Sequence, residues 1–345
     1  MLPAITVAEQ LVSDRRRLLI AAYGFEDRSL GWVHSQKDAG CILSGALIFR
    51  YVHSKGRNRV SALRKAIVPL GVTSPLDACY NLSAPHSIED SIGNKLAQLL
   101  PGIDEVIVDV SAMTKLLLLV TLCKLAEFPR AVRIVYAEPD DYAPTRDEYE
   151  SSKDLAATFP SRGFGMIVRT GCLSSIRMQG QPVSMVAFTS FNEQLVGHML
   201  GTISPHRLLF INGRPPRDDY SWRERATQEI HQRLINEYPE DNPLDERGLL
   251  VRSASTLDYR QTFERLEEIY GASNYERIIV AATGSKMQML GLFLSKIAHP
   301  DIHIEYPTPD SYLVSGISRG VRRVHQVVFP SFARTLKSLK RRAVP

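Results

Sequence analysis

Short apolar runs alternate along the chain with polar turns and with stretches of helical periodicity. Runs such as "RLLIAA" (17–22) and "EVIVDV" (105–110) have the length and the branched residues of buried strands. Helices of about 10–15 residues are expected between such runs, as in strand–helix–strand units. This alternation predicts an α/β fold in which helices cover a mainly parallel sheet.

The chain repeats itself at a nearly fixed offset. When Lys115 is set over Lys286, which lies 171 positions later, "EVIVDVSAMTKLLLLVTLCKL" aligns with "ERIIVAATGSKMQMLGLFLSKI" without a gap. Farther on, "VRIVYAEPDDYAP" aligns with "IHIEYPTPDSYLV", where Tyr142 and Tyr312 are 170 positions apart. Two matches at almost the same offset indicate that one structural unit occurs twice.

Two Rossmann-like halves follow from this repeat. We predict a first half at 1–182, which includes a connecting hairpin segment within 144–182, and a second half at 183–345 with a basic C-terminal tail. The expected fold class is α/β, with two mainly parallel-sheet halves arranged as an intramolecular pseudo-dimer.

Composition places the chain among ordinary globular proteins. Of its 345 residues, 44% are hydrophobic and 23% are charged. No apolar run approaches the roughly 18 residues that a membrane-spanning helix needs, and the start lacks the pattern of a secretory signal. None of the four cysteines forms a CxxC pair or lies at zinc-ligand spacing. We therefore expect a reducing, cytoplasmic setting, no membrane contact, no metal and no cofactor.

The positive charge is concentrated in a few segments. A net charge of +5 and an isoelectric point near 9.0 permit an anionic partner. The tail "SFARTLKSLKRRAVP" (331–345) has the pattern of an amphipathic basic helix, which either contacts nucleic acid or a protein partner or is simply a solvated terminal helix. An aromatic content of 8% gives no support for a platform that stacks single-stranded RNA.

The turn before each repeated apolar helix carries hydroxyl groups and a lysine. In an open parallel sheet, ligands bind beyond the carboxyl ends of the strands, where a helix N-terminus offers free N–H groups and a positive dipole end. Such a turn suits phosphate, and the residues concerned are Ser111, Thr114 and Lys115 in the first half and Thr283, Gly284, Ser285 and Lys286 in the second. The alternative is that Ser111 and Thr283 only cap helices. No Walker A loop is present.

These turns resemble the signature of CARF domains, a strand followed by [DN]-x-T-G-G-T-K-x-M and an apolar helix. In "DVSAMTKLL", Ser111, Thr114 and Lys115 take the positions of the first T, the second T and the K. "VAATGSKMQM" keeps one glycine and the lysine, with Ala282 where the first T is expected. The resemblance implies a sensor domain of a prokaryotic, CRISPR-associated antiviral defence system that binds a cyclic oligonucleotide and passes a signal to an effector or defence-complex protein.

In CARF domains the turn after the first strand forms the other wall of the pocket. The resemblance therefore adds Tyr23, Gly24, Phe25 and Arg28 in the first half and Thr189, Ser190 and Asn192 in the second. CARF domains pair about a two-fold axis, and the related SAVED domains do so within one chain. The two halves are expected to form such a pair and to line one pocket with both lysine-bearing turns.

Several functions remain open beside pure sensing. A slow, metal-independent ring nuclease would use Lys115 and Lys286 as catalytic residues, to stabilise the phosphorane during in-line attack by a ribose 2′-hydroxyl. A non-catalytic scaffold of a defence complex would have lost its ligand, as the missing glycines suggest. A nucleotide-metabolising Rossmann enzyme would need a carboxylate in the pocket, and the candidates are Glu26, Asp27, Asp109 and Glu193.

Overall fold

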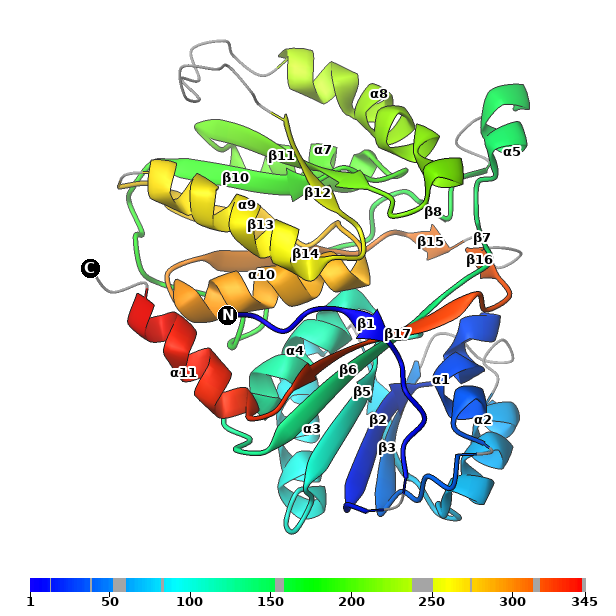
Figure 1. Ribbon diagram of the computed structural model, residues 1–345. Coiled ribbons are helices and arrows are strands. Elements are labelled where there is room, and N and C mark those ends of the chain that lie inside the picture. Colours follow the sequence, from blue (N-terminus) through cyan, green and yellow to red (C-terminus); the bar gives the residue numbers. More distant parts are fainter. Residues whose placement is uncertain are drawn as a thin grey trace. The chain divides into compact units, whose positions relative to one another are not determined.

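The computed structural model shows two compact units (Figure 1). It describes residues 1–12, 14–37, 39–51, 60–81, 84–152, 158–237, 251–273, 275–312 and 317–342. Unit 1 comprises Met1–Thr145 and Val314–Ser338, and unit 2 comprises Arg146–Leu313 and Leu339–Pro345. Among the helices of the described residues, none is long and apolar enough to cross a membrane.

Unit 1 contains a sheet of seven strands in the order β1-β17-β6-β5-β2-β3-β4. Five of them run parallel, and β17 and β1 add an antiparallel edge. The strands are β1 (Thr6–Val7), β2 (Arg17–Ala22), β3 (Gly45–Tyr51), β4 (Leu76–Tyr80), β5 (Glu105–Asp109), β6 (Ala131–Glu138) and β17 (Arg323–Phe329). All residues of β2, β5 and β6 are buried, because helices cover both faces of this part of the sheet.

The helices of unit 1 lie on both faces of the sheet (Figure 1). They are α1 (Gly31–Ser35), α2 (Val60–Ile67), α3 (Pro85–Leu99) and α4 (Lys115–Leu125), with short 3-10 turns at Asp27–Leu30 and Val68–Leu70. Trp32 of α1 and Ile67 of α2 pack into a buried core with Leu19 and Ile48 of the sheet. The run of leucines in α4 is buried almost all round, which explains why its sequence is apolar on every side.

Unit 2 contains a sheet of six strands in the order β12-β11-β10-β13-β14-β9. Only β9 is antiparallel, and it forms the edge next to β14. The strands are β9 (Ile167–Val168), β10 (Val183–Phe188), β11 (Arg207–Arg214), β12 (Val251–Ser255), β13 (Arg277–Ala281) and β14 (His303–Pro307). Its helices are α5 (Arg146–Ser151), α7 (Gln194–Ile203), α8 (Trp222–Glu237), α9 (Tyr259–Ala272) and α10 (Lys286–Ala298), with a 3-10 turn at Asp218–Tyr220.

The five parallel strands have the same spatial order in both units. Numbered along the chain within each unit, they are arranged third, second, first, fourth, fifth. This is the arrangement of a Rossmann-like half, in which the direction of winding changes between the first and the fourth strand. The predicted α/β class and the two mainly parallel sheets are confirmed.

The units divide at a different place from the predicted boundary at 182/183. The segment 146–182 lies in unit 2, where β9 pairs with β14, and β17, which follows the last strand of the second half, pairs with β6 in unit 1. The expected connecting hairpin is also wrong, because β8 (Ser161–Arg162) pairs with β15 (Ser311–Tyr312) and not with β9. Each half of the sequence thus supplies the strand that covers the open edge of the other half's sheet.

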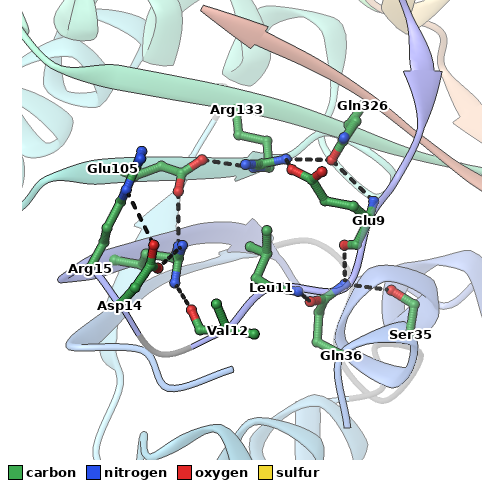
Figure 2. A network of polar contacts seen from close by, with 11 residues as sticks. Glu9, Leu11, Val12, Asp14, Arg15, Ser35, Gln36, Glu105, Arg133 and Gln326 are labelled. Carbon is green, nitrogen blue, oxygen red and sulfur yellow. Dashed lines mark hydrogen bonds and ion pairs between the residues drawn. The ribbon is translucent and has the colours of Figure 1, made fainter. Parts of the chain in front are cut away.

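A buried polar network fixes β17 and the N-terminal segment at the amino end of the unit 1 sheet (Figure 2). The Glu105 carboxylate, 1% exposed, accepts hydrogen bonds from Arg17 at 2.8 Å and from Arg133 at 2.7 Å. Arg133 also donates to the side chains of Gln326 at 2.5 Å and Glu9 at 2.9 Å. The buried charges are therefore paired, as burial requires.

The predicted basic tail forms helix α11 (Phe332–Arg342). Phe332 and Leu336 are buried, whereas Arg334, Lys337 and Lys340 are exposed, so the helix is amphipathic as predicted. Residues 343–345 of the predicted tail lie outside the described residues.

Candidate ligand-binding edges of the two sheets

The place where a ligand would bind is set by the strand order. In unit 1 the chain leaves β2 toward β3 and leaves β5 toward β6, so the turns after β2 and β5 diverge at the carboxyl edge of the sheet. In unit 2 the equivalent turns follow β10 and β13. All the predicted site residues lie on these four turns or at the helix starts that follow them.

The turn between β5 and α4 is held by its own hydroxyl groups. The Ser111 side chain is fully buried, and its Oγ accepts a hydrogen bond from the backbone N–H of Ala137 at 2.8 Å. Thr114 is the N-cap of α4, since its Oγ1 accepts from the N–H of Leu117 at 3.2 Å and donates to the Tyr80 hydroxyl at 3.0 Å. Both hydroxyls therefore stabilise the turn. The alternative that Ser111 and Thr283 cap the helices is wrong, because the N-caps are Thr114 and Ser285.

Lys115 is the first residue of α4 and is half-buried. Burial lowers the pKa of its ammonium group to about 8. The lysine is thus charged at neutral pH at a cost in solvation, which a bound anion would offset.

The turn between β13 and α10 is built differently. The Thr283 hydroxyl donates to the carbonyl of Phe188 at 2.7 Å and accepts from its N–H at 3.0 Å, which closes the turn onto the end of β10. Ser285 caps α10 in a reciprocal arrangement with Gln288. A Cβ at Gly284 would lie 2.8 Å from the Phe188 ring, so packing alone requires glycine there. Lys286 is again the first helical residue.

The turn after β2 contacts the turn after β5. A Cβ at Gly24 would lie 2.7 Å from the Cβ of Ala112, so the two turns pack against each other. Tyr23 is fully buried, and its hydroxyl accepts from Arg64 at 2.9 Å. Phe25 is half-buried.

Arg28 lies in a buried polar cluster instead of facing solvent. Its guanidinium donates to Glu26 at 2.8 Å and to the Tyr136 hydroxyl at 3.4 Å, and Tyr136 is hydrogen-bonded to Tyr142 at 2.8 Å. Burial lowers the pKa of Arg28, but the Glu26 carboxylate and the tyrosines outweigh it and hold the pKa above its ordinary value. Glu26 also accepts a hydrogen bond from Ser318, which follows the last parallel strand of the second half.

The turn after β10 is also tied to distant segments. The Thr189 hydroxyl donates to Asn212, and the Ser190 hydroxyl is hydrogen-bonded within its own turn. Asn192, 6% exposed, donates to the Ser161 hydroxyl at 3.4 Å and to the carbonyl of Gly163 at 3.0 Å. Asn192 has the same place in the turn after β10 that Glu26 has in the turn after β2. Each side chain is hydrogen-bonded to the serine of a Ser-Arg-Gly sequence, Ser161 or Ser318.

Two groups near these turns were missed from the sequence. One is an aromatic cluster in unit 2, where Phe191 and Tyr149 surround Trp222, and the Arg223 guanidinium lies 4.4 Å from the centre of the Phe191 ring. Its members come from three separate parts of the chain, so no local sequence motif predicts the cluster. The other comprises the Ser-Arg-Gly segments 161–163 and 318–320, whose repetition was visible in the sequence but is short.

Three of the four carboxylates considered for a metabolic enzyme form hydrogen bonds within unit 1. Glu26 binds Arg28 and Ser318, Asp27 accepts from the N–H of Gly320 at 3.0 Å, and Asp109 accepts from the N–H of Ser111 at 2.9 Å. Within the part of the chain that the structure describes, no three His, Cys, Asp or Glu side chains are grouped so as to hold a metal ion.

Comparisons with known proteins identify no family. No protein-family model matches the chain, and no curated protein matches it in sequence. The cytoplasmic domain of a prokaryotic cation chloride cotransporter aligns with a TM-score of 0.25 at 7% identity, over 87% of this chain and 99% of its own. MurG of Acinetobacter baumannii aligns with a TM-score of 0.25 at 12% identity, over 84% of this chain and 86% of its own. Similarities at this level say nothing about function.

Proposed function

We propose that each unit binds a phosphate-bearing nucleotide at the carboxyl edge of its sheet. One observation carries the proposal: in both units, at the same switch point of the same strand order, the helix after the fourth strand begins with a hydroxyl N-cap followed at once by a lysine, Lys115 or Lys286. The resemblance to CARF domains makes a cyclic oligonucleotide messenger the favoured ligand and prokaryotic antiviral defence the favoured setting.

The chemistry available at these edges suits a phosphate group. The N-terminus of α4 or α10 supplies the positive end of the helix dipole, and the lysine adds a full charge. The turn hydroxyls serve a different purpose, because their hydrogen bonds hold the turns in shape. In the proposed site, lysine and backbone N–H groups contact the phosphate, and the hydroxyls position them.

The proposal is tested by the melting temperature of the protein with cyclic oligoadenylates of several ring sizes, linear oligoadenylates, ATP and NAD. A ligand at about 100 times its Kd stabilises the folded state by about 2.7 kcal/mol. Lys115→Ala and Lys286→Ala should each reduce the shift without lowering the melting temperature of the free protein. Lys124→Ala, at the other end of α4, is the matched control. Equal loss of stability and of binding would assign both lysines a structural role.

The fate of the ligand separates a sensor from a ring nuclease. Chromatography of the incubated ligand shows a linear product only if the ring is cut. In that case Lys115 and Lys286 are the residues proposed to stabilise the phosphorane.

A scaffold subunit of a defence complex is the second candidate function. Two observations favour it. The turn hydroxyls form hydrogen bonds within the fold, and packing against Phe188 already explains the glycine at 284; the hydroxyls are those of Ser111, Thr114, Thr283 and Ser285. The exposed basic face of α11, with Arg334, Lys337 and Lys340, would then be the surface to examine for a protein or nucleic-acid partner. A complete lack of ligand-induced stabilisation supports this candidate.

A further inference from the structure

The amino edge of the unit 1 sheet carries a row of charged residues. Three neighbouring strands, β2, β5 and β6, are directly preceded by Arg16, Asp104 and Arg130. The Asp104 carboxylate forms ion pairs with both arginines, at an N–O distance of 3.7 Å for Arg16. The two arginine side chains are 63% and 50% exposed. Because two guanidinium groups share one carboxylate, a net positive charge faces solvent at this edge.

Helix α11 is attached to the same edge. Strand β17 runs antiparallel to β6, so its last residue, Phe329, lies opposite Val132 at the start of β6 (Figure 1). The N–H of Phe332, the first residue of α11, donates a hydrogen bond to the carbonyl of Arg130 at 3.0 Å. The first turn of α11 therefore lies directly beside Arg130.

The exposed face of α11 carries positive charge and no negative charge. Arg334, Lys337 and Lys340 are exposed and follow one another at intervals of three residues, about 4.5 Å along the helix axis. The sequence of the helix, "FARTLKSLKRR", contains no acidic residue. Among the residues that the structure describes, none forms an ion pair with any of these three side chains.

Two other exposed helices of the chain mix both signs of charge. In α8, Arg225 is paired with Glu229 at 2.7 Å, and Arg233 is paired with Glu237 at 3.6 Å. Helix α5 has the same i,i+4 arrangement at Arg146. Solubility of a helix is provided by such mixed faces, whereas a face of a single sign suits a partner of the opposite charge.

The apolar face of α11 is already used by the fold. Phe332, Leu336 and Leu339 are at most 5% exposed, and the ring of Phe332 packs on Phe329 with 5.3 Å between the ring centres. A basic amphipathic helix binds a membrane surface by burying its apolar side among the lipids, which this packing prevents. Only the charged face of α11 is left for a partner.

The charge pattern of this surface complements a nucleic-acid duplex. A duplex carries one negative charge per about 1.7 Å of its axis, so a row of exposed cations contacts several phosphates at once. Proteins that bind single strands add exposed aromatic rings on which the bases stack. The phenylalanines next to this surface are buried, and they are Phe128, Phe329 and Phe332. The surface therefore fits the backbone of a duplex better than unpaired bases.

We propose that the amino edge of unit 1 binds the phosphate backbone of a nucleic-acid duplex without reading its sequence. The contacting residues are Arg16, Arg130, Arg334, Lys337 and Lys340. In unit 1, Lys115 follows the carboxyl end of β5, whereas Asp104 precedes its amino end. The two surfaces lie at opposite ends of the strands, so this inference is independent of the proposed nucleotide site.

The test is the fluorescence anisotropy of a labelled duplex of about 20 base pairs, as DNA and as RNA, between about 50 and about 200 mM NaCl. Three to five phosphate contacts give a slope of log K against log salt of about −3 to −4.5 for DNA. The triple variant Arg334→Ala/Lys337→Ala/Lys340→Ala should reduce the size of this slope by about 2.5–3 and weaken binding more than about tenfold. Its melting temperature should match that of the parent protein, because the three side chains are exposed.

The matched control is Arg146→Ala/Arg225→Ala/Arg233→Ala, which removes the same charge from α5 and α8. It should bind the duplex as the parent protein does. An equal loss of binding in the control and in the α11 variant would show attraction by net charge alone and would overturn the inference. Absence of duplex binding by the parent protein, or tighter binding of the single strand of the same sequence, would also overturn it.

Vesicles that contain phosphatidylserine test the alternative partner. If the parent protein binds these vesicles and not the duplex, and the α11 variant binds neither, the surface is assigned to an anionic membrane and the inference is overturned. None of these outcomes affects the proposed nucleotide site, which is tested by Lys115→Ala and Lys286→Ala.

Discussion

In the proposed site, Lys115 would couple ligand binding to pH. Burial holds the pKa of its ammonium group at about 8, so the group loses its proton in a range where an exposed lysine keeps it. A phosphate next to the ammonium favours the charged form and raises this pKa. Binding of an anion therefore requires the protonated lysine and takes up a proton whenever the lysine is neutral.

Affinity for the ligand is expected to be greatest below the pKa of Lys115 and to fall as the pH rises from about 7 to about 9. The pKa of Lys115 is lower in the folded protein than in the unfolded chain, so the unfolded chain binds more protons as the pH rises from about 7 to about 9. The free energy of unfolding of the free protein is therefore expected to rise over this range. Calorimetric titrations at several pH values measure the effect. A pH profile that is unchanged in Lys115→Ala would contradict it.

Ser111 shows that a residue can match a binding motif and still serve the fold. Its buried Oγ accepts from the N–H of Ala137, and Ser111→Ala leaves that N–H without a partner. We expect the free energy of unfolding to fall by about 1–3 kcal/mol, measured by urea denaturation. Ser338→Ala, an exposed serine of α11, should change it far less. Unchanged stability together with lost binding would show that Ser111 contacts the ligand directly.

At the scale of elements, helix α10 is fixed by its contact with α9. A Cβ at Gly291 would lie against the backbone of Tyr259 and 2.8 Å from Thr262, so α9 can approach only because residue 291 is glycine. Gly197 in α7 is the contrasting case, since a Cβ there meets nothing within 4 Å.

Opposite effects on stability follow for these two helical glycines. Gly291→Ala should destabilise unit 2 by about 1–3 kcal/mol through overpacking. Gly197→Ala should stabilise it by about 0.5–1 kcal/mol, because alanine is the better helix former. Thermal unfolding of both variants decides the matter. A neutral or stabilising Gly291→Ala would show that α9 and α10 are not in this contact.

Strong periodic segments were predictable, and short paired ones were not. The strands "EVIVD" and "RIIVA" and the apolar helices after them stood out because both faces of the sheet are covered. Four strands of two residues each are too short for any periodicity, and they pair with partners far away in sequence. They are β7 (Asp141–Tyr142), β8, β15 and β16 (Ser318–Arg319). The hydroxyls of the turns were expected to face a ligand, whereas the structure shows that they form hydrogen bonds within the fold.

At the scale of the whole molecule, the exchange of edge strands makes the halves of the sequence interdependent. β17 covers β6 over seven paired residues, and Gln326 of β17 joins the buried network of Arg133 and Glu105. The predicted boundary at 182/183 failed for this reason, since proximity in sequence does not decide which sheet an edge strand joins.

A chain that ends at residue 313 would leave the edge of β6 unpaired. We expect this truncated protein to lose cooperative unfolding of unit 1 and to aggregate, because an exposed, apolar strand edge recruits other chains. Co-expression of residues 314–345 as a separate chain should restore solubility. Solubility and calorimetric unfolding measure both effects, and a truncated protein as stable as the full chain would contradict the exchange.

The central claim is that the lysine-bearing carboxyl edges bind a phosphate-bearing nucleotide. The most direct measurement is the ligand-induced shift in melting temperature for the parent protein and for the Lys115→Ala/Lys286→Ala double variant, across the oligoadenylate, ATP and NAD panel. At about 100 times Kd, the account predicts a rise of about 5–10 °C with a cyclic oligoadenylate for the parent protein, and little or none for the double variant. No rise for the parent with any ligand, or an equal rise for both proteins, would contradict it.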